Sequence, residues 1–396
     1  MGNGSVSTTG SARDGGQFQP RRVIGYYAGW TRKTKNFTPL DIPADKLTHI
    51  NYAFGLIDED GRAILQNAEA DIGNSDVVDG PDPGSLLGNF DQLRLLKEQH
   101  PHLQTMISMG GWTGSGHFSD AVATDVKRRE FVASCIDLFL SRWPGVFDGI
   151  DIDWEYPVCC GLPENSYRPE DRRNCTLLFE ELRRQLDDLG AATGQRYLLT
   201  AAIPAGREIP VTSFELPECG QILDWINVMT YDMTGSQRSG VTNFNAPFAE
   251  SSADPSDPDW KHFSSVVGTI GSFVDEGVPH DKLVVGVPFY GRGFTGVPAA
   301  NDGLYQPFTE MMSADYHTIK ADYLPKFRRF RHPEADVPWL YDAESGTMLS
   351  YDDPESIGRK TDYVIAEGLG GVMLWELSGD DKESSLLTAI SSRLRP

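Results

Sequence analysis

Cysteine, histidine and long apolar runs are scarce in this sequence, and each scarcity excludes a class of protein. The 396 residues include five cysteines and eight histidines. The histidines are scattered, and no C-x-x-C pair stands with a matching pair of histidines, so we expect no bound metal. No apolar run reaches the ~18 residues that a membrane-spanning helix needs, so we expect no association with a membrane.

Positive charge is also in short supply. The chain carries 35 lysines and arginines against 57 aspartates and glutamates, a formal net charge of −22 at pH 7. A chain this acidic repels nucleic acid at long range, so we expect no nucleic-acid partner. A neutral, hydroxyl-rich ligand such as a sugar meets no such repulsion. The plainer interpretation, that the acidic residues serve solubility, stays open.

The cysteines are odd in number, so at least one thiol stays free. Cys135 lies in a segment with helical character, where we expect a buried apolar side chain. Cys159, Cys160 and Cys175 flank one polar loop. We expect a disulfide that closes this loop, as exported proteins often have.

The length of the chain predicts more than one compact unit. A single hydrophobic core rarely extends beyond ~250–300 residues, so we expect one large domain with an insertion, or two domains. Residues 1–20 are rich in Gly, Ser and Thr. They contain no apolar segment of the kind found in signal peptides, so we expect a flexible leader and no intact signal peptide.

Short segments rich in branched and aromatic residues recur along the chain, and each is predicted to be a β-strand. Most are apolar throughout, which is typical of strands buried on both faces. The predicted strands are Val23–Trp30, Leu47–Ile57, Thr105–Trp112, Phe147–Tyr156, Tyr197–Ile203, Trp225–Met233, Leu283–Tyr290 and Gly371–Leu377. Amphipathic helices are predicted at Val126–Trp143, Thr176–Leu189, Phe263–Val274 and Glu383–Leu394.

This alternation of strand and helix, repeated about eight times, predicts an α/β fold of the (β/α)8 TIM-barrel type. An open doubly wound sheet is the alternative. Its dinucleotide-binding version is weakened because no G-x-G-x-x-G follows an early strand.

The connection from Tyr290 to Gly371 is longer than the usual crossover between parallel strands. It contains two segments, Trp339–Asp342 and Met348–Asp352, that predict a short hairpin. We therefore expect a small α+β insertion subdomain at residues 294–360, between strand 7 and helix 7. The barrel would comprise residues 21–293 and 361–396. An insertion at that connection lies on the catalytic face of a barrel, where it would deepen the site into a groove.

The most informative segment is Phe147–Pro157, which carries a row of carboxylic acids. Side chains alternate along a strand, so Asp151, Asp153 and Glu155 point the same way. Burial and mutual repulsion resist joint ionisation, so at least one carboxyl should stay protonated near neutral pH, as a general acid must. Glu155 is last in the row, at the carboxyl end of the strand, where barrel enzymes place their chemistry. We therefore assign it the proton, with Asp153 to orient it and Asp151 behind as a store of charge.

Two other interpretations of the acidic segment stay open. A calcium loop needs a glycine turn at its sixth position and lacks large apolar residues at alternate positions, which disfavours it here. A purely structural acidic strand is the second. Asp148 has the opposite parity, and we expect it to have a separate structural role at the start of the strand.

Asp148-x-x-Asp151-x-Asp153-x-Glu155, followed by Tyr156-Pro157, resembles the signature of glycoside hydrolase family 18, the chitinases. The resemblance extends from about Val23 to Leu377, with a motif at the end of almost every predicted strand. The further matching motifs are Gly25-Tyr26-Tyr27, Asn51-Tyr52-Ala53-Phe54, Ser108-Met109-Gly110-Gly111-Trp112, Met229-Thr230-Tyr231-Asp232, Gly286-Val287-Pro288-Phe289-Tyr290-Gly291-Arg292 and Gly370-Gly371-Val372-Met373-Leu374-Trp375.

The resemblance implies a retaining, substrate-assisted hydrolysis of β-1,4-linked N-acetylglucosamine polymers, without a cofactor. The catalytic residues would be Glu155, Asp153, Asp151 and Tyr231. The residues implied to bind or surround the sugar are Trp375, Asp232, Arg292, Tyr290, Trp112, Tyr26, Phe54, Ser108 and Met229. We expect a secreted monomer whose partners are chitin and chitooligosaccharides.

Two alternative functions share this site. An endo-β-N-acetylglucosaminidase acting on glycans would use the same acidic strand, although the insertion and Arg292 favour the chitinase. A chitin lectin binds without cutting and typically loses the acid, whereas Glu155 is present here.

Further tryptophans could stack on more distant sugars, with Trp225 the one expected in the core. The candidates are Trp112, Trp225, Trp260 and Trp339. Many family members carry a tryptophan shortly after the sixth-strand motif, on the leaving side of the site. Gln237 stands there in this chain, which predicts a weaker grip on the leaving-side sugar.

Overall fold

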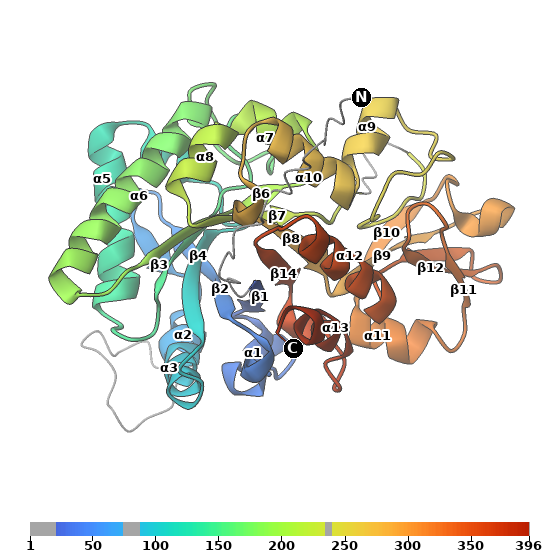
Figure 1. Ribbon diagram of the computed structural model, residues 1–396, viewed down its shortest axis with the longest axis horizontal. Coiled ribbons are helices and arrows are strands. Elements are labelled where there is room, and N and C mark those ends of the chain that lie inside the picture. The colour runs from blue at the N-terminus through green and yellow to red at the C-terminus, as the bar shows by residue number, and fades with distance from the viewer. Residues whose placement is uncertain (1–20, 74–87, 234–239, 396) are drawn as a thin grey trace, which may run out of the picture.

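The computed structural model describes residues 21–73, 88–233 and 240–395, and the predicted leader at residues 1–20 lies outside them. Within those residues, eight parallel strands form a closed barrel, and a second sheet lies to one side of it (Figure 1). In order around the barrel, the strands are β1 (Arg22–Ala28), β14 (Gly371–Trp375), β8 (Leu283–Pro288), β7 (Trp225–Met229), β6 (Leu198–Pro204), β5 (Gly149–Asp153), β4 (Gln104–Gly110) and β2 (His49–Ile57). Pairing of β1 with β2 closes the ring, which confirms the predicted (β/α)8 barrel.

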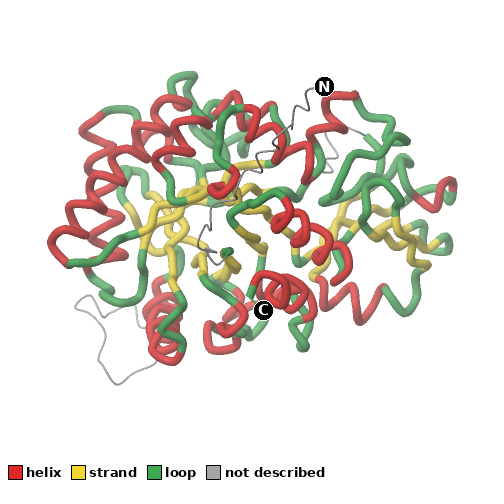
Figure 2. Tube along the Cα trace, viewed as in Figure 1, coloured by secondary structure: helices red, strands yellow, loops and turns green. Residues whose placement is uncertain are grey.

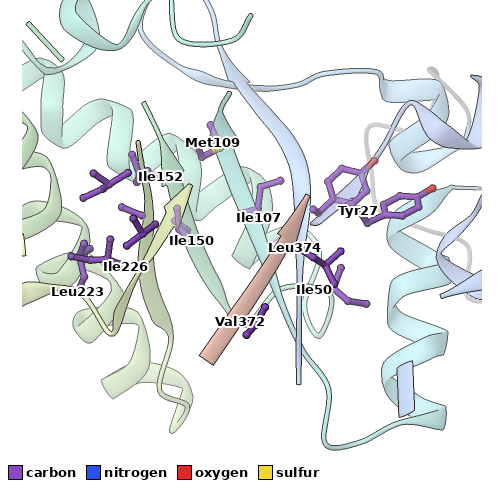
Figure 3. Close-up of a cluster of buried hydrophobic side chains, with 14 of the residues drawn as sticks. Tyr27, Ile50, Ile107, Met109, Ile150, Ile152, Leu223, Ile226, Val372 and Leu374 are labelled. Carbon is purple, nitrogen blue, oxygen red and sulfur yellow. The ribbon is translucent and has the colours of Figure 1, made fainter. Parts of the chain in front are cut away.

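The barrel strands are buried along almost their whole length, because helices cover the outer face and side chains fill the interior. Outward-facing residues such as Ile107, Ile150 and Val372 join one continuous apolar core (Figure 3). The strands therefore show continuous apolar runs without a simple alternation. A short strand, β3 (Ala63–Leu65), pairs antiparallel with β2 at the edge of the ring.

Helices fill most of the connections between the barrel strands and ring the barrel (Figure 1). The helices are α1 (Thr31–Thr34), α2 (Ala68–Ile72), α3 (Asn89–Gln99), α4 (Phe118–Val122), α5 (Asp125–Cys135), α6 (Asp171–Thr193), α7 (Glu208–Ser213), α8 (Leu216–Ile222), α9 (Pro258–Phe263), α10 (Val266–Asp275), α11 (Tyr316–Thr318), α12 (Pro354–Ala366) and α13 (Ser385–Leu394). Local chemistry sets several of these ends. The Ser265 hydroxyl accepts the Gly268 N–H at the start of α10, and α6 stops at Gly194, which adopts a left-handed conformation with φ of 74°.

The second sheet contains five antiparallel strands that lie between β8 and α12 in the chain (Figure 2). They are β9 (Tyr290–Thr295), β10 (Glu310–Asp315), β11 (Arg328–Arg331), β12 (Pro338–Asp342) and β13 (Thr347–Ser350). β12 and β13 form the predicted hairpin, with Trp339 opposite Ser350. The sheet begins at Tyr290, before residue 294, and α12 crosses residue 360 to contact α13, β8 and β14. The division into a barrel and an insertion subdomain at residues 294–360 stays a prediction.

Several strands end earlier than their sequence predicts. β5 stops at Asp153 although the predicted strand runs to Tyr156, and β7 stops at Met229 although the predicted strand runs to Met233. The residues beyond the last paired position leave the ladder at the mouth of the barrel, so their side chains are free to line a site. None of the helices in the described parts of the chain combines the length and the apolar character that a membrane span requires.

The cysteines differ from expectation at one point. Cys159 and Cys160 form a disulfide with each other, so the predicted disulfide closing the loop to Cys175 is wrong. Cys175 lies on the buried face of α6, which turns its thiol into the core and away from the loop. Cys135 is a buried free thiol, as predicted, and Cys175 and Cys219 are two more.

Candidate active site

A groove of about 1860 Å³ crosses the mouth of the barrel at the carboxyl ends of the strands. Ten of the predicted site residues line it: Tyr26, Phe54, Trp112, Asp153, Glu155, Met229, Tyr231, Asp232, Arg292 and Trp375. Asp151, Ser108 and Tyr290 are not part of its lining. The acidic row of β5 thus runs from the barrel interior out into the groove.

Asp151 forms the inner end of the acidic row and is fully buried. Its carboxylate accepts hydrogen bonds from the Tyr26 hydroxyl at 2.7 Å, the Ser108 hydroxyl at 2.8 Å, the Thr200 hydroxyl at 2.5 Å and the Asn227 amide at 3.2 Å. Burial raises the pKa of Asp151, and these donors act against that rise by stabilising the charged form. Asp151 is therefore a saturated carboxyl that no ligand can reach.

Asp153 lies one step nearer the groove and is buried as well. Its Oδ1 atom has no hydrogen-bond partner among the described residues. Burial raises the pKa of Asp153 well above its usual range, and the charges of Glu155 and Asp151 raise it further. A buried acceptor without a donor is costly, so Asp153 is ready to accept a hydrogen bond from a ligand.

Glu155 lies just beyond the end of β5, and its half-buried side chain reaches into the groove. The alternation nevertheless continues, because Trp154 points outward and stacks on Phe118, with ring centroids 5.1 Å apart. Burial raises the pKa of Glu155 to about 7, with a smaller increase from the charge of Asp232. The pKa values of both Glu155 and Asp153 are therefore raised, and the two carboxyls titrate as a coupled pair. The assignment of the proton to Glu155 stays a prediction.

The segment after β7 supplies two further groups. The Tyr231 hydroxyl lies 3.8 Å from the Met373 sulfur, and burial raises its pKa well above the usual range, so it keeps its proton and can donate. The Asp232 Oδ1 atom accepts a hydrogen bond from Arg292 Nε at 2.8 Å and forms an ion pair with a terminal guanidinium nitrogen of the same residue at 2.7 Å. The Arg292 guanidinium lies 5.2 Å from the centroid of the Tyr290 ring, so this ring packs against the cation of the Asp232–Arg292 ion pair.

Aromatic rings form one wall and the base of the groove. The Trp375 ring stacks on Phe54, with centroids 5.8 Å apart and an angle of 18° between the ring planes. Tyr26 lies 5.4 Å and Trp30 6.3 Å from the same indole. Sequence reasoning missed Trp30 as a site residue, although it ends the first predicted strand, and that position was the available signal.

The remaining tryptophans divide between the groove and the cores. Trp112 is 45% exposed and lines the groove, as does Trp260 of α9. Trp225 is buried inside the barrel with the Arg22 guanidinium 4.5 Å from its ring centroid. Trp339 is buried in the second sheet, where it stacks on the Phe330 ring, so neither of these two reaches the groove. Gln237 lies outside the described residues.

Neither alternative for the acidic segment gains support from the structure. The segment is a strand and not a calcium loop, and across the described parts of the chain no group of three His, Cys, Asp or Glu residues could hold a metal ion. Asp148 does have the separate role expected of it: its carboxylate binds the Lys97 ammonium at 2.7 Å and the Thr105 N–H at 2.8 Å. The unpaired Asp153 oxygen inside a groove argues against a merely structural strand.

Comparison with known proteins points to one family. The model of the glycosyl hydrolases family 18 matches residues 22–380. Chitinase A1 of Niallia circulans is 40% identical over 400 residues, covering 91% of this chain and 56% of that protein. Chitinase 63 of Streptomyces plicatus is 34% identical over 416 residues, covering 99% of this chain and 64% of that protein.

A solved structure, chitinase ChiA74 from Bacillus thuringiensis, superimposes with a TM-score of 0.86 at 37% identity, covering 95% of this chain and 70% of that one. The chain spans less than two thirds of the length of the curated relatives named above.

Proposed function

Because this chain belongs to the glycosyl hydrolases family 18, we propose that it is a chitinase, which hydrolyses β-1,4-linked N-acetylglucosamine polymers by a retaining, substrate-assisted mechanism. The observation that carries the proposal is the unpartnered Asp153 oxygen, buried beside Glu155 in an aromatic groove. The N–H of a 2-acetamido group is a donor of the kind that this oxygen lacks. A sugar without the acetamido group would leave it unsatisfied.

The nucleophile in this proposal is the acetamido oxygen of the substrate. Most retaining glycosidases use a second carboxylate, and enzymes with substrate assistance are the exception. Beyond the strand, the carboxylate whose charge reaches Glu155 is Asp232. Its Oδ1 atom is already hydrogen-bonded and ion-paired to Arg292. A carboxylate held in this way is a weak nucleophile, which favours attack by the substrate itself.

The steps follow from the positions of three side chains. Glu155, protonated through its raised pKa, gives its proton to the leaving glycosidic oxygen. Asp153 accepts the acetamido N–H and stabilises the positive charge that develops on the cyclic intermediate. The Tyr231 hydroxyl donates to the acetamido oxygen and directs it to the anomeric carbon. Glu155, now ionised, takes a proton from water, which opens the intermediate and returns the β anomer.

The sugar chain would lie across the mouth of the barrel. β1 and β6 face each other in the closed strand order, so Trp30 after β1 and α7 after β6 stand at opposite ends of the groove. We place the distorted sugar over Trp375, gripped by Asp232 and Arg292, because a flat aromatic surface suits the apolar face of a pyranose. Binding energy from such contacts can be used to distort the ring at the bond that breaks.

Trp112 and Trp260 are proposed to contact the leaving side of the chain. Trp260 belongs to the connection that follows β7. The same connection contains Gln237, which stands at the position where many family members have a tryptophan. Both side chains line the groove. Chitin is insoluble, so we propose that the protein acts outside the cell. We also propose that it is a monomer.

The test is time-resolved product analysis of N-acetylglucosamine hexamer hydrolysis, with wild type beside Glu155→Gln. Release of shorter oligomers with the β anomer first, and a silent variant, would support both the activity and the mechanism. Binding of the hexamer without cleavage by wild type would instead point to a lectin. Cleavage only of N-glycan cores would point to an endo-β-N-acetylglucosaminidase.

A further inference from the structure

The loop at residues 157–166 follows the acidic row directly and carries the Cys159–Cys160 disulfide; we call it the brace loop. Cys160 is exposed and lines the groove together with Gly161. Neither the proposed chemistry nor the apolar cores use these two residues. The brace loop is therefore a part of the groove wall whose role is unassigned.

The brace loop packs on the backbone of Glu155. The Asn165 side-chain amide donates to the Glu155 carbonyl at 3.2 Å. Gly161 approaches the same carbonyl so closely that a Cβ atom there would lie 2.3 Å from it. At the far end of the loop, the N–H and the hydroxyl of Ser166 bind the Gly116 carbonyl at 3.2 and 2.9 Å. The neighbouring Ser115 hydroxyl accepts the Glu155 N–H at 2.9 Å, so both peptide groups of Glu155 are held.

The backbone of the brace loop is unusual on both sides of Cys159. Val158 and Cys160 each have φ of 72°, a left-handed conformation that is rare for residues other than glycine and rarest for a β-branched side chain. Such conformations persist only where the surroundings enforce them, and they cluster at functional sites. The covalent link between Cys159 and Cys160 is the constraint at hand.

This disulfide is poorly suited to a role in global stability. A disulfide stabilises a protein mainly by restricting the unfolded chain, and the effect grows with the length of the closed loop. A link between adjacent residues closes the shortest loop possible, so its effect on the unfolded chain is small. Its consequences must be local, at the groove wall and at the backbone of Glu155.

We propose that the Cys159–Cys160 disulfide positions the catalytic acid by fixing the brace loop against Glu155, and that its reduction lowers turnover. The inference rests on the proposed function. A dithiol such as dithiothreitol supplies two electrons and two protons, breaks the S–S bond to give two thiols, and closes its own disulfide. Relaxation of Val158 and Cys160 would then withdraw Gly161 and Asn165 from the Glu155 carbonyl.

A looser brace loop also changes the environment of the acid. Glu155 faces Asp153, Tyr156, Tyr231 and Asp232, and burial is the largest cause of its raised pKa. Water entering beside Glu155 would lower that pKa, so the rate would begin to fall at a lower pH than in the oxidised protein. A purely structural role would leave this pH limit unchanged.

The experiment measures hexamer hydrolysis by the folded wild type before and after dithiothreitol, with the melting temperature of each form. Alkylation and mass spectrometry would identify the cysteines released. We expect kcat to fall roughly ten- to hundredfold, because small displacements of a catalytic group have effects of that size. We expect the melting temperature to stay nearly constant and the alkaline limit of the pH profile to move to lower pH.

Two variants serve as controls. The double variant Cys159→Ala, Cys160→Ala should have the kcat and the pH profile of the reduced wild type. The reductant should change neither. Cys175→Ala removes a buried free thiol and should keep the full response to reductant. Full kcat with an unchanged pH profile in the reduced protein would overturn the inference, and so would a fall in melting temperature that accounts for the lost rate. If the untreated wild type does not cleave the hexamer, it is the proposed function that fails.

Discussion

Two of the regions in which the chain buries carboxylates treat them in opposite ways. Behind the second sheet, Asp352 is 1% exposed and both its oxygens bind the Lys360 ammonium, at 2.7 and 2.8 Å. The lysine is itself fully buried, and the Ser356 hydroxyl donates to the same carboxylate. At the barrel mouth, Asp153 and Glu155 are placed side by side, and among the described residues no cation offsets the rise in their pKa values. One region neutralises its buried charge, and the other keeps like charges together.

The difference separates a structural carboxylate from a reactive one. Burial raises the pKa of Asp352, but Lys360 opposes the rise, so the pair can stay ionised. For Asp153, every contributing cause raises the pKa. Such an arrangement destabilises the fold, and it persists where a proton must be stored and delivered. Substitution of the carboxylates in each region tests this difference.

The largest effect is expected for Glu155→Gln. The amide cannot deliver a proton, so kcat should fall about a thousandfold, within the usual range for a general acid. Hexamer binding, measured by calorimetry, should persist because the groove keeps its shape. Turnover close to that of wild type would remove Glu155 from the role of acid.

Asp352→Asn should act on stability and leave the chemistry alone. The change leaves the buried Lys360 charge without its counter-ion, which should cost about 3 kcal/mol of unfolding free energy. Denaturant titration would measure the loss, and kcat of the folded fraction should equal that of wild type. The matched variant Asp352→Leu, Lys360→Met removes both charges and should recover most of the stability. A large loss of kcat with unchanged stability would mean that the pair belongs to the site.

Asp153→Asn should reduce kcat about a hundredfold, since the charge that stabilises the cyclic intermediate is lost. The alkaline limit of the rate should move to lower pH, because Glu155 no longer shares a proton with an acidic neighbour. Profiles of kcat and of kcat/KM against pH measure the two effects. An unchanged profile would show that the two carboxyls titrate independently.

The smallest effect concerns stability at alkaline pH. The pKa of Glu155 rises from 4.5 to about 7 on folding, so its protonated form favours the native state below the lower value. This contribution is lost as the pH rises through the folded value. Glu155→Gln cannot ionise, so the variant should be more stable than wild type near pH 8, and the difference should vanish near pH 4. Thermal unfolding of both proteins at the two pH values tests this. A variant that is no more stable than wild type near pH 8 would contradict it.

The fold and most of the groove lining could be predicted because their signals are local. Buried parallel strands must be apolar, so runs such as the one that became β8 stand out. Alternation along β5 placed Asp151, Asp153 and Glu155 on one face, and the structure keeps that order from the interior to the groove. The role of each remains a proposal.

Other features had no local signal. The partner of Asp352 is a lysine on the following helix, and nothing in the spacing marks the two as a buried pair. The pairing of Cys159 with Cys160 depends on where α6 turns Cys175. Trp30 joined the aromatic wall only because closure of the barrel brings β1 beside β14.

The sequence by itself determined the alternating strands and helices, the row of carboxyls and the residue types around them, because these follow from periodicity and from the chemistry of single side chains. Only the tertiary structure decided which carboxyl found four donors and which oxygen found none. The physical reason is that burial and hydrogen bonding depend on residues distant in the chain, which meet at the barrel mouth only when the ring of strands closes.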